Sequence, residues 1–175
     1  MSLFGFLFGK KEEEARPSQQ QSAARPGAMA PGTHIAYSPE LVDELKQEHQ
    51  QLIAVFQGIA EAFGEGDLAE TCRRLETFRG GILAHLLKEN VRFYIYLEHA
   101  LAGDPTSHAL MHQFRHEMDG IGKAVVAFLT KYSEMATKPE LAASFGADLN
   151  AVGGVLVQRI QNEESNLYPL YLPAY

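Results

Sequence analysis

Two segments of this chain resemble each other, and each places two polar side chains four residues apart in a row of apolar residues. The pairs are His85 with Glu89 in residues 82–97, and Arg159 with Glu163 in residues 156–171. Side chains four residues apart share one face of an α-helix, so each pair points in the same direction as the apolar residues around it. Burying such groups without partners costs several kcal/mol. A bound metal ion is therefore the first candidate for the partner that satisfies them.

Two more polar residues fall on apolar rows elsewhere in the chain. His49 fills the gap between Leu45 and Leu52. Glu117 lies about 60° from the centre of the apolar row of its own helix, at about 100° per residue. A single histidine on an apolar row is usually a core residue satisfied by hydrogen bonds. A whole set of inward polar groups is harder to explain in that way, because each destabilises the fold unless it has a partner.

The apolar rows predict four helices that bring these groups together. They run over about residues 39–63, 68–102, 106–135 and 140–167, and the turns between them contain Gly, Pro or Asp. Ser38, followed by Pro39 and Glu40, predicts the start of the first helix. Four long amphipathic segments joined by short turns favour an all-α fold, an up-down four-helix bundle. Gly80 and Gly81 in the second helix indicate a close helix approach or a bend.

Three histidines form a stripe on the third helix. His108, His112 and His116 lie four residues apart, roughly opposite the apolar row, so they face outward. Such a stripe can bind a metal ion at the surface or respond to pH. An ordinary solvated face is the favoured interpretation.

The chain resembles the hemerythrin-like (HHE cation-binding) family of four-helix bundles over about residues 39–171. The matching pieces are residues 45–53, residues 85–89, and residues 160–169 with their Glu-Glu-x-x-Leu-Tyr-Pro ending. The resemblance implies a carboxylate-bridged di-iron centre between the helices, in proteins that carry oxygen or sense oxygen, redox state or iron. It places His49, His85, Glu89 and Glu163 at ligand positions of the family.

Two residues depart from the pattern of the family. A histidine is expected on the third helix where Glu117 is the inward residue, and another on the fourth helix where Arg159 stands. Arginine neither loses its proton nor coordinates a metal. The complete di-iron ligand set is therefore absent.

Charge counting suggests one ion in place of two. Three glutamates and Arg159 leave a net charge of about -2, which one divalent cation would balance. His49, His85 and Glu89 are a ligand set typical of mononuclear Fe(II), and Glu163 or Glu117 could add a ligand while Arg159 holds the surplus carboxylate. One ion is the favoured interpretation, ahead of a metal-free ionic network and of a two-metal site.

Composition limits the other functions. The chain has 175 residues, 46% of them hydrophobic, and a net charge of -7, which predicts one domain and argues against nucleic-acid binding. We expect a flexible, disordered N-terminal tail over residues 1–33 and the bundle over residues 34–175. The apolar segment Met1 to Gly9 could contact a membrane surface or a protein partner. A single cysteine fits a reducing compartment, so we expect a cytoplasmic protein, with membrane association as the alternative that the N-terminal segment allows.

The sequence thus predicts a hemerythrin-like protein that binds a cation, most readily iron. Its role would be sensing, storage or protection involving oxygen, redox state or iron, with dioxygen or nitric oxide as a further ligand. No arrangement typical of a hydrolase or kinase occurs, and we expect no enzymatic activity. The alternative is a metal-free regulatory interaction module tethered by its N-terminal segment. The sequence does not determine the oligomeric state.

Overall fold

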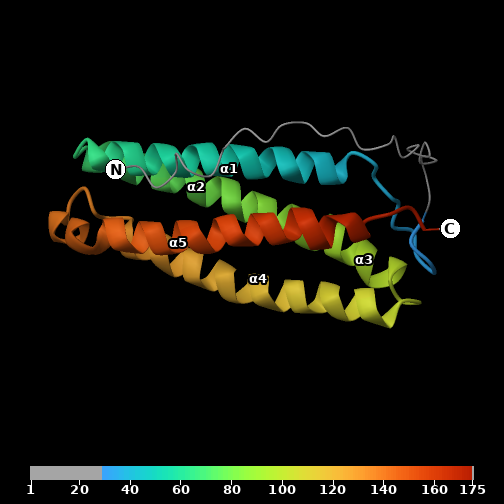
Figure 1. Ribbon diagram of the computed structural model, residues 1–175. Helices are drawn as coiled ribbons and strands as arrows, with labels where there is room; N and C mark the ends of the chain where they lie inside the picture. Colours follow the sequence, from blue (N-terminus) through green and yellow to red (C-terminus); the bar gives the residue numbers. More distant parts are fainter. Residues whose placement is uncertain (1–28, 175) are drawn as a thin grey trace, which may run out of the picture.

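A computed structural model describes residues 29–174 as a bundle of long helices that run alternately up and down, side by side (Figure 1). The helical elements are α1 (Leu41–Gly64), α2 (Leu68–Lys88), η2 (Glu89–Tyr94), α3 (Ile95–Ala100), α4 (Pro105–Tyr132), η3 (Pro139–Leu141), α5 (Ala142–Asn162), η4 (Glu163–Leu167) and η5 (Tyr168–Leu170). Within these residues the only β-type pairing is an isolated bridge between Met29 and Ala36. The predicted all-α, up-down bundle is confirmed.

Helix boundaries follow local capping chemistry, with one correction. Asp67 and Asp104 cap α2 and α4, because their carboxylates accept hydrogen bonds from the first free backbone N–H groups. The first helix was expected to start at about Pro39, and α1 begins two residues later, at Leu41. The backbone N–H of Ser38 instead donates to the hydroxyl of Tyr171, 3.1 Å away, which holds this residue against the C-terminal segment.

The interior is divided into two apolar clusters with a polar layer between them. One cluster surrounds Phe56 and Phe78, and the other surrounds Leu45 and Phe93. Their buried polar neighbours are His49, His85, Glu89, Arg159 and Glu163. Burial of the apolar clusters on both sides stabilises the packing of the helices. The polar side chains between them are held in place by this packing.

Glycines allow helices to approach closely below the polar layer. A Cβ atom added to Gly153 of α5 would lie 2.8 Å from Phe56 Cε1, and one added to Gly81 of α2 would lie 3.1 Å from Leu52 Cδ2. The expected close approach at the glycine pair of α2 therefore occurs at Gly81, whereas a Cβ atom at Gly80 would meet no atom within 4 Å. These contacts bring α1 against both α2 and α5.

The expected apolar segment Met1 to Gly9 and most of the expected disordered tail lie outside the described residues. Immediately after them, the turn at residues 30–35 packs on the end of the bundle, where Ala30 is buried against Leu41 and its neighbours. None of the helices in residues 29–174 combines the length and the hydropathy that crossing a membrane requires.

Candidate metal centre

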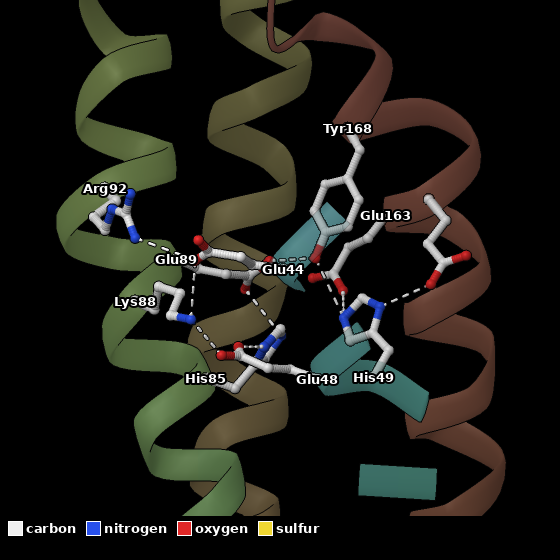
Figure 2. A network of polar contacts seen from close by, with 10 residues as sticks. Glu44, Glu48, His49, His85, Lys88, Glu89, Arg92, Glu163 and Tyr168 are labelled. Carbon is white, nitrogen blue, oxygen red and sulfur yellow. Dashed lines mark hydrogen bonds and ion pairs between the residues drawn. The ribbon is translucent and has the colours of Figure 1, made fainter. Parts of the chain in front are cut away.

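Two histidines from neighbouring helices face each other in the polar layer. His49 of α1 and His85 of α2 are almost fully buried, and their ring centroids lie 4.7 Å apart (Figure 2). Each Nδ1 atom lies 2.9 Å from a carboxylate oxygen, Glu164 Oε1 for His49 and Glu48 Oε2 for His85. A carboxylate only accepts hydrogen bonds, so each Nδ1 carries a proton. In the neutral ring, Nε2 is then left as a lone-pair donor.

The Nε2 atoms point at two buried glutamates. His49 Nε2 lies 3.4 Å from Glu163 Oε2, and His85 Nε2 lies 3.9 Å from Glu89 Oε2. One ligand atom from each of His49, His85 and Glu163 lies within 4.8 Å of the others. Two imidazole nitrogens and carboxylate oxygens therefore converge on one region, as the sequence predicts for these four residues.

Both glutamates stand at the start of a π-helical segment. Glu89 opens η2 and Glu163 opens η4, at matching positions of the two repeated sequences. A π-helical turn inserts a residue and rotates the chain beyond it, and such turns are frequent at functional sites. Five residues after each glutamate stands a tyrosine, Tyr94 or Tyr168, and each tyrosine contacts a charged group of the other copy. Tyr168 donates to Glu89 Oε1 at 2.9 Å, and Arg159 donates through Nη2 to the Tyr94 hydroxyl at 3.0 Å.

Arg159 reaches the same layer from α5 and holds one side of Glu163. Its Nε donates to Glu163 Oε1 at 2.6 Å, so that oxygen is engaged while Oε2 faces His49. Its guanidinium carbon Cζ also lies over the ring of Phe114, 4.8 Å from the centroid. Arg159 therefore satisfies the surplus carboxylate oxygen, the role that charge counting predicts for it.

Glu117 corrects the sequence-based assignment. It was expected to face inward from the third helix, but its side chain is 47% exposed and accepts a hydrogen bond from Gln113. Its Oε2 atom is 3.7 Å from Arg159 Nη1, so it contacts the layer only from outside. The side chain is exposed because a position about 60° from the centre of the apolar row lies at the edge of the helix interface, where a long side chain can extend into solvent. Met118, the next residue, lines the interior instead.

The pKa shifts divide the four groups into two pairs. Glu89 and His85 are shifted toward their neutral forms, and Glu163 and His49 toward their charged forms. Burial, followed by the charge of Glu163, raises the pKa of Glu89 to about 8. Burial would also raise the pKa of Glu163, but His49 and Arg159 outweigh it and lower that pKa. Burial lowers the pKa of His85. It opposes the charged form of His49 as well, but hydrogen bonds to Glu163 and Glu164 raise the pKa of His49.

Glu89 provides the test of whether a cation fits. Among the described residues, its Oε2 is one of two buried side-chain polar atoms without a hydrogen-bond partner, the other being Arg159 Nη1. A buried acceptor left unpaired is costly, and Oε2 faces His85 Nε2, 3.9 Å away. Imidazole nitrogens and carboxylate oxygens are ligands for divalent transition metals. The donors and the unpaired oxygen both fit a cation.

A small cavity opens beside this layer. It has a volume of about 40 Å³, and the polar residues line one end while Phe56, Ile82, Met118 and other apolar residues line the rest. A single water needs roughly 10–15 Å³ measured in this way. The cavity therefore has room for an ion with one or two small molecules beside it.

A comparison with protein-family models gives a match to the hemerythrin HHE cation-binding domain over residues 39–171, which is most of the chain. The chain belongs to the hemerythrin HHE cation-binding family. Comparisons with curated proteins and with solved structures give no significant match. This hemerythrin-family domain is accordingly a cation-binding domain, and the polar layer holds its candidate ligands.

Five residues of this hemerythrin-family site were not predicted from the sequence. Glu48 and Glu164 orient the histidines, and Tyr94 and Tyr168 connect the repeated segments. Each glutamate is adjacent in sequence to a predicted ligand, about 100° further around its helix, at the seam with the next helix. The position next to an inward ligand was the available signal. Lys88, which ion-pairs with Glu48, was missed for the same reason.

Proposed function

We propose that this domain binds a single iron ion through His49, His85, Glu89 and Glu163. Two imidazoles with carboxylates are the ligand type associated with mononuclear non-haem Fe(II). The observation that carries the proposal is the unpaired Oε2 of Glu89, which faces Nε2 of His85 in a layer where both histidine rings are fixed through Nδ1. Carboxylates that fix a ligating histidine in this way are typical of metal sites.

The hydrogen bonds of the two buried glutamates favour one ion over two. Glu163 Oε1 is engaged by Arg159, and Glu89 Oε1 is engaged by Tyr168, so each carboxylate has one oxygen left for a metal. A carboxylate that bridges two metals in the common mode binds one metal with each oxygen. The guanidinium of Arg159 also adds a positive charge where a second cation would lie.

The bound iron would supply redox chemistry and affinity for diatomic ligands. We propose that the domain uses it in sensing, storage or protection that involves dioxygen, nitric oxide or iron itself, without turning over a substrate. The small, mostly apolar cavity beside the ligands supports this role, since its volume suits a diatomic molecule. We further propose a cytoplasmic location, with membrane association depending on Met1 to Gly9.

Metal analysis and an electronic spectrum test the proposal. Protein isolated without oxygen and dialysed against metal-free buffer is expected to retain about one iron per chain. After aeration it should lack the near-ultraviolet absorption of an oxo-bridged di-iron centre. The His49→Ala variant should lose the ion, while the exposed-site control His116→Ala should keep it. Retention of no iron, manganese or zinc, or of two irons with that absorption, would overturn the single-iron proposal.

A second candidate is a regulatory module that binds a helix of a partner protein. One observation favours it: Leu83, Leu87, Val91 and Ile95 form a row every fourth residue along α2, η2 and α3, and they are 37–62% exposed. Exposed apolar rows on one helix face are typical of protein contacts. The test is localisation and partner capture with residues 1–33 deleted and, separately, with Leu87→Lys. An iron-binding role alone predicts that neither change has an effect.

A further inference from the structure

A second group of metal-ligand side chains lies at the junction of α3 and α4, away from the buried layer. Glu98 comes from α3, and His108 and His112 come from the first two turns of α4. His108 Nε2 lies 3.1 Å from Glu98 Oε1, and His112 Nε2 lies 3.4 Å from the same oxygen. One ligand atom from each of the three residues lies within 4.8 Å of the others.

The arrangement of the two rings explains why they meet. Histidines four residues apart occupy successive turns of one helix face. Their ring centroids here are 4.5 Å apart and the planes are nearly perpendicular, so both Nε2 atoms reach the same oxygen. His116, one turn further along, takes no part in the group. The group therefore contains two of the three histidines of the outer stripe, His108 and His112, together with the carboxylate of Glu98 from α3.

We propose that Glu98, His108 and His112 form a second, surface cation site for a divalent ion of the zinc and copper class. In the metal-free state, His108 Nε2 donates to Glu98 Oε1, and His112 Nε2 lies close to the same oxygen. When a divalent cation binds, the ring proton of each neutral histidine is carried on Nδ1, so that both Nε2 lone pairs and the Glu98 carboxylate coordinate the ion. Two imidazoles with one carboxylate match the ligand preference of Cu²⁺, Zn²⁺ and Ni²⁺.

The exposure of these side chains sets the character of the site. Glu98 and His108 are about one-third exposed and His112 about half exposed. Water therefore fills the remaining coordination positions, and the ion exchanges with solvent more readily than one in the buried layer. The net charge of -7 favours a cation at this surface.

An ion at this position would clamp α3 to α4 across the loop at residues 101–104. Only the folded chain brings Glu98 to the two histidines, so the ion binds the native state and stabilises it. The clamp lies over the apolar cluster that contains Leu97 and Met111. We expect metal binding to protect this end of the bundle from local opening.

Titration of the full chain with Cu²⁺ and Zn²⁺ after chelation tests the site. Isothermal titration should show two classes of site, and the Cu²⁺ electron paramagnetic resonance spectrum of the surface class should show coupling to two imidazole nitrogens. The His112→Ala variant should weaken the surface class by about tenfold or more and reduce the coupling to one nitrogen. The matched control His116→Ala should change neither.

The His49→Ala variant distinguishes the two sites in the titration. It should remove the buried class of metal site and leave the surface class intact. If the surface class survives His112→Ala unchanged, or disappears equally in His116→Ala, the proposal is overturned. The Glu98→Gln variant gives an independent check, because it keeps both histidines and removes the anionic ligand. Loss of the buried class alone bears only on the iron proposal.

Discussion

Tyr168 donates its hydroxyl hydrogen to Glu89 across the bundle, at 2.9 Å, and so joins the second repeated segment to the first. The reverse connection runs from Arg159 to Tyr94. Each copy thus supplies one charged group and one tyrosine, and each tyrosine serves the charged group of the other copy. The two carboxylates of the candidate centre are fixed in relation to each other by this reciprocal pair.

Removing the Tyr168 hydroxyl leaves Glu89 with two unpaired oxygens. Tyr168→Phe is expected to lower the free energy of unfolding of the metal-free protein by about 1–3 kcal/mol. The loss should be smaller with iron bound, because the cation then satisfies Glu89. Urea denaturation with and without metal measures both values. Tyr96→Phe, which removes a hydrogen bond to the Leu172 carbonyl, should show the same loss in both conditions; a similar pattern in Tyr168→Phe would count against the site.

Glu164 orients His49 without facing the proposed ion. Glu164→Gln is expected to weaken iron binding by about 10–100-fold with little change in fold, the effect of losing a carboxylate behind a ligating histidine. Competition with a chromogenic chelator measures the affinity. Glu117→Gln is the control, because this exposed side chain contacts no histidine of the layer in the described structure and approaches it only through Arg159 Nη1, 3.7 Å away. Equal weakening in both variants would show that Glu117 is closer to the ion than the fold indicates.

Arg159 and Glu163 form a buried ion pair, and removing one partner leaves the other charge unpaired. Arg159→Leu is expected to destabilise the metal-free protein by roughly 3–5 kcal/mol. Adding Glu163→Gln should recover part of that loss, because the unpaired carboxylate is gone. Chemical denaturation of the single and double variants in chelator gives the coupling energy. Strictly additive losses would mean that the pair does not interact.

The contact between Gly153 and Phe56 gives a matched pair of substitutions. Gly153→Ala would place its Cβ 2.8 Å from the Phe56 ring, so the ring must shift, at a cost of about 1–3 kcal/mol. Gly154→Ala meets no atom within 4 Å and should be neutral or stabilising by roughly 0.5–1 kcal/mol. The melting temperatures of both variants, measured by thermal unfolding, test this difference. Equal melting temperatures would argue against close packing of α1 on α5.

Asp148 introduces a pH dependence at the opposite end of the bundle. Hydrogen bonds from Lys131 and from the buried hydroxyl of Tyr132 lower the pKa of Asp148. Because its folded pKa lies below the unfolded one, its contribution is present above the unfolded pKa, near 3.9, and is lost as pH falls through the folded pKa. Asp148→Asn should therefore be less stable at neutral pH and lose less stability on acidification. Unfolding between pH 2 and 7 checks this, with Asp119→Asn as the exposed control.

The bundle and its main candidate ligands follow from periodicity. Apolar residues every three or four positions place His49, His85, Glu89 and Glu163 inward, because a helix fixes the direction of each side chain relative to its neighbours. Glu117 shows where this reasoning fails. Near the edge of an apolar row the direction alone does not decide burial, since a long side chain turns either inward or outward depending on the neighbouring helix.

By itself, the sequence determined the four helices, the inward direction of His49, His85, Glu89 and Glu163, and the similarity of the two segments that each carry a glutamate and a tyrosine. All of these are local properties, set by spacing along one chain segment. Tertiary structure decided which groups meet: Glu48 and Glu164 behind the histidines, Tyr168 on Glu89, and Glu98 beside His108 and His112. These contacts join residues from different elements, so they depend on helix rotation and on the π-helical turns, which only the packed bundle fixes.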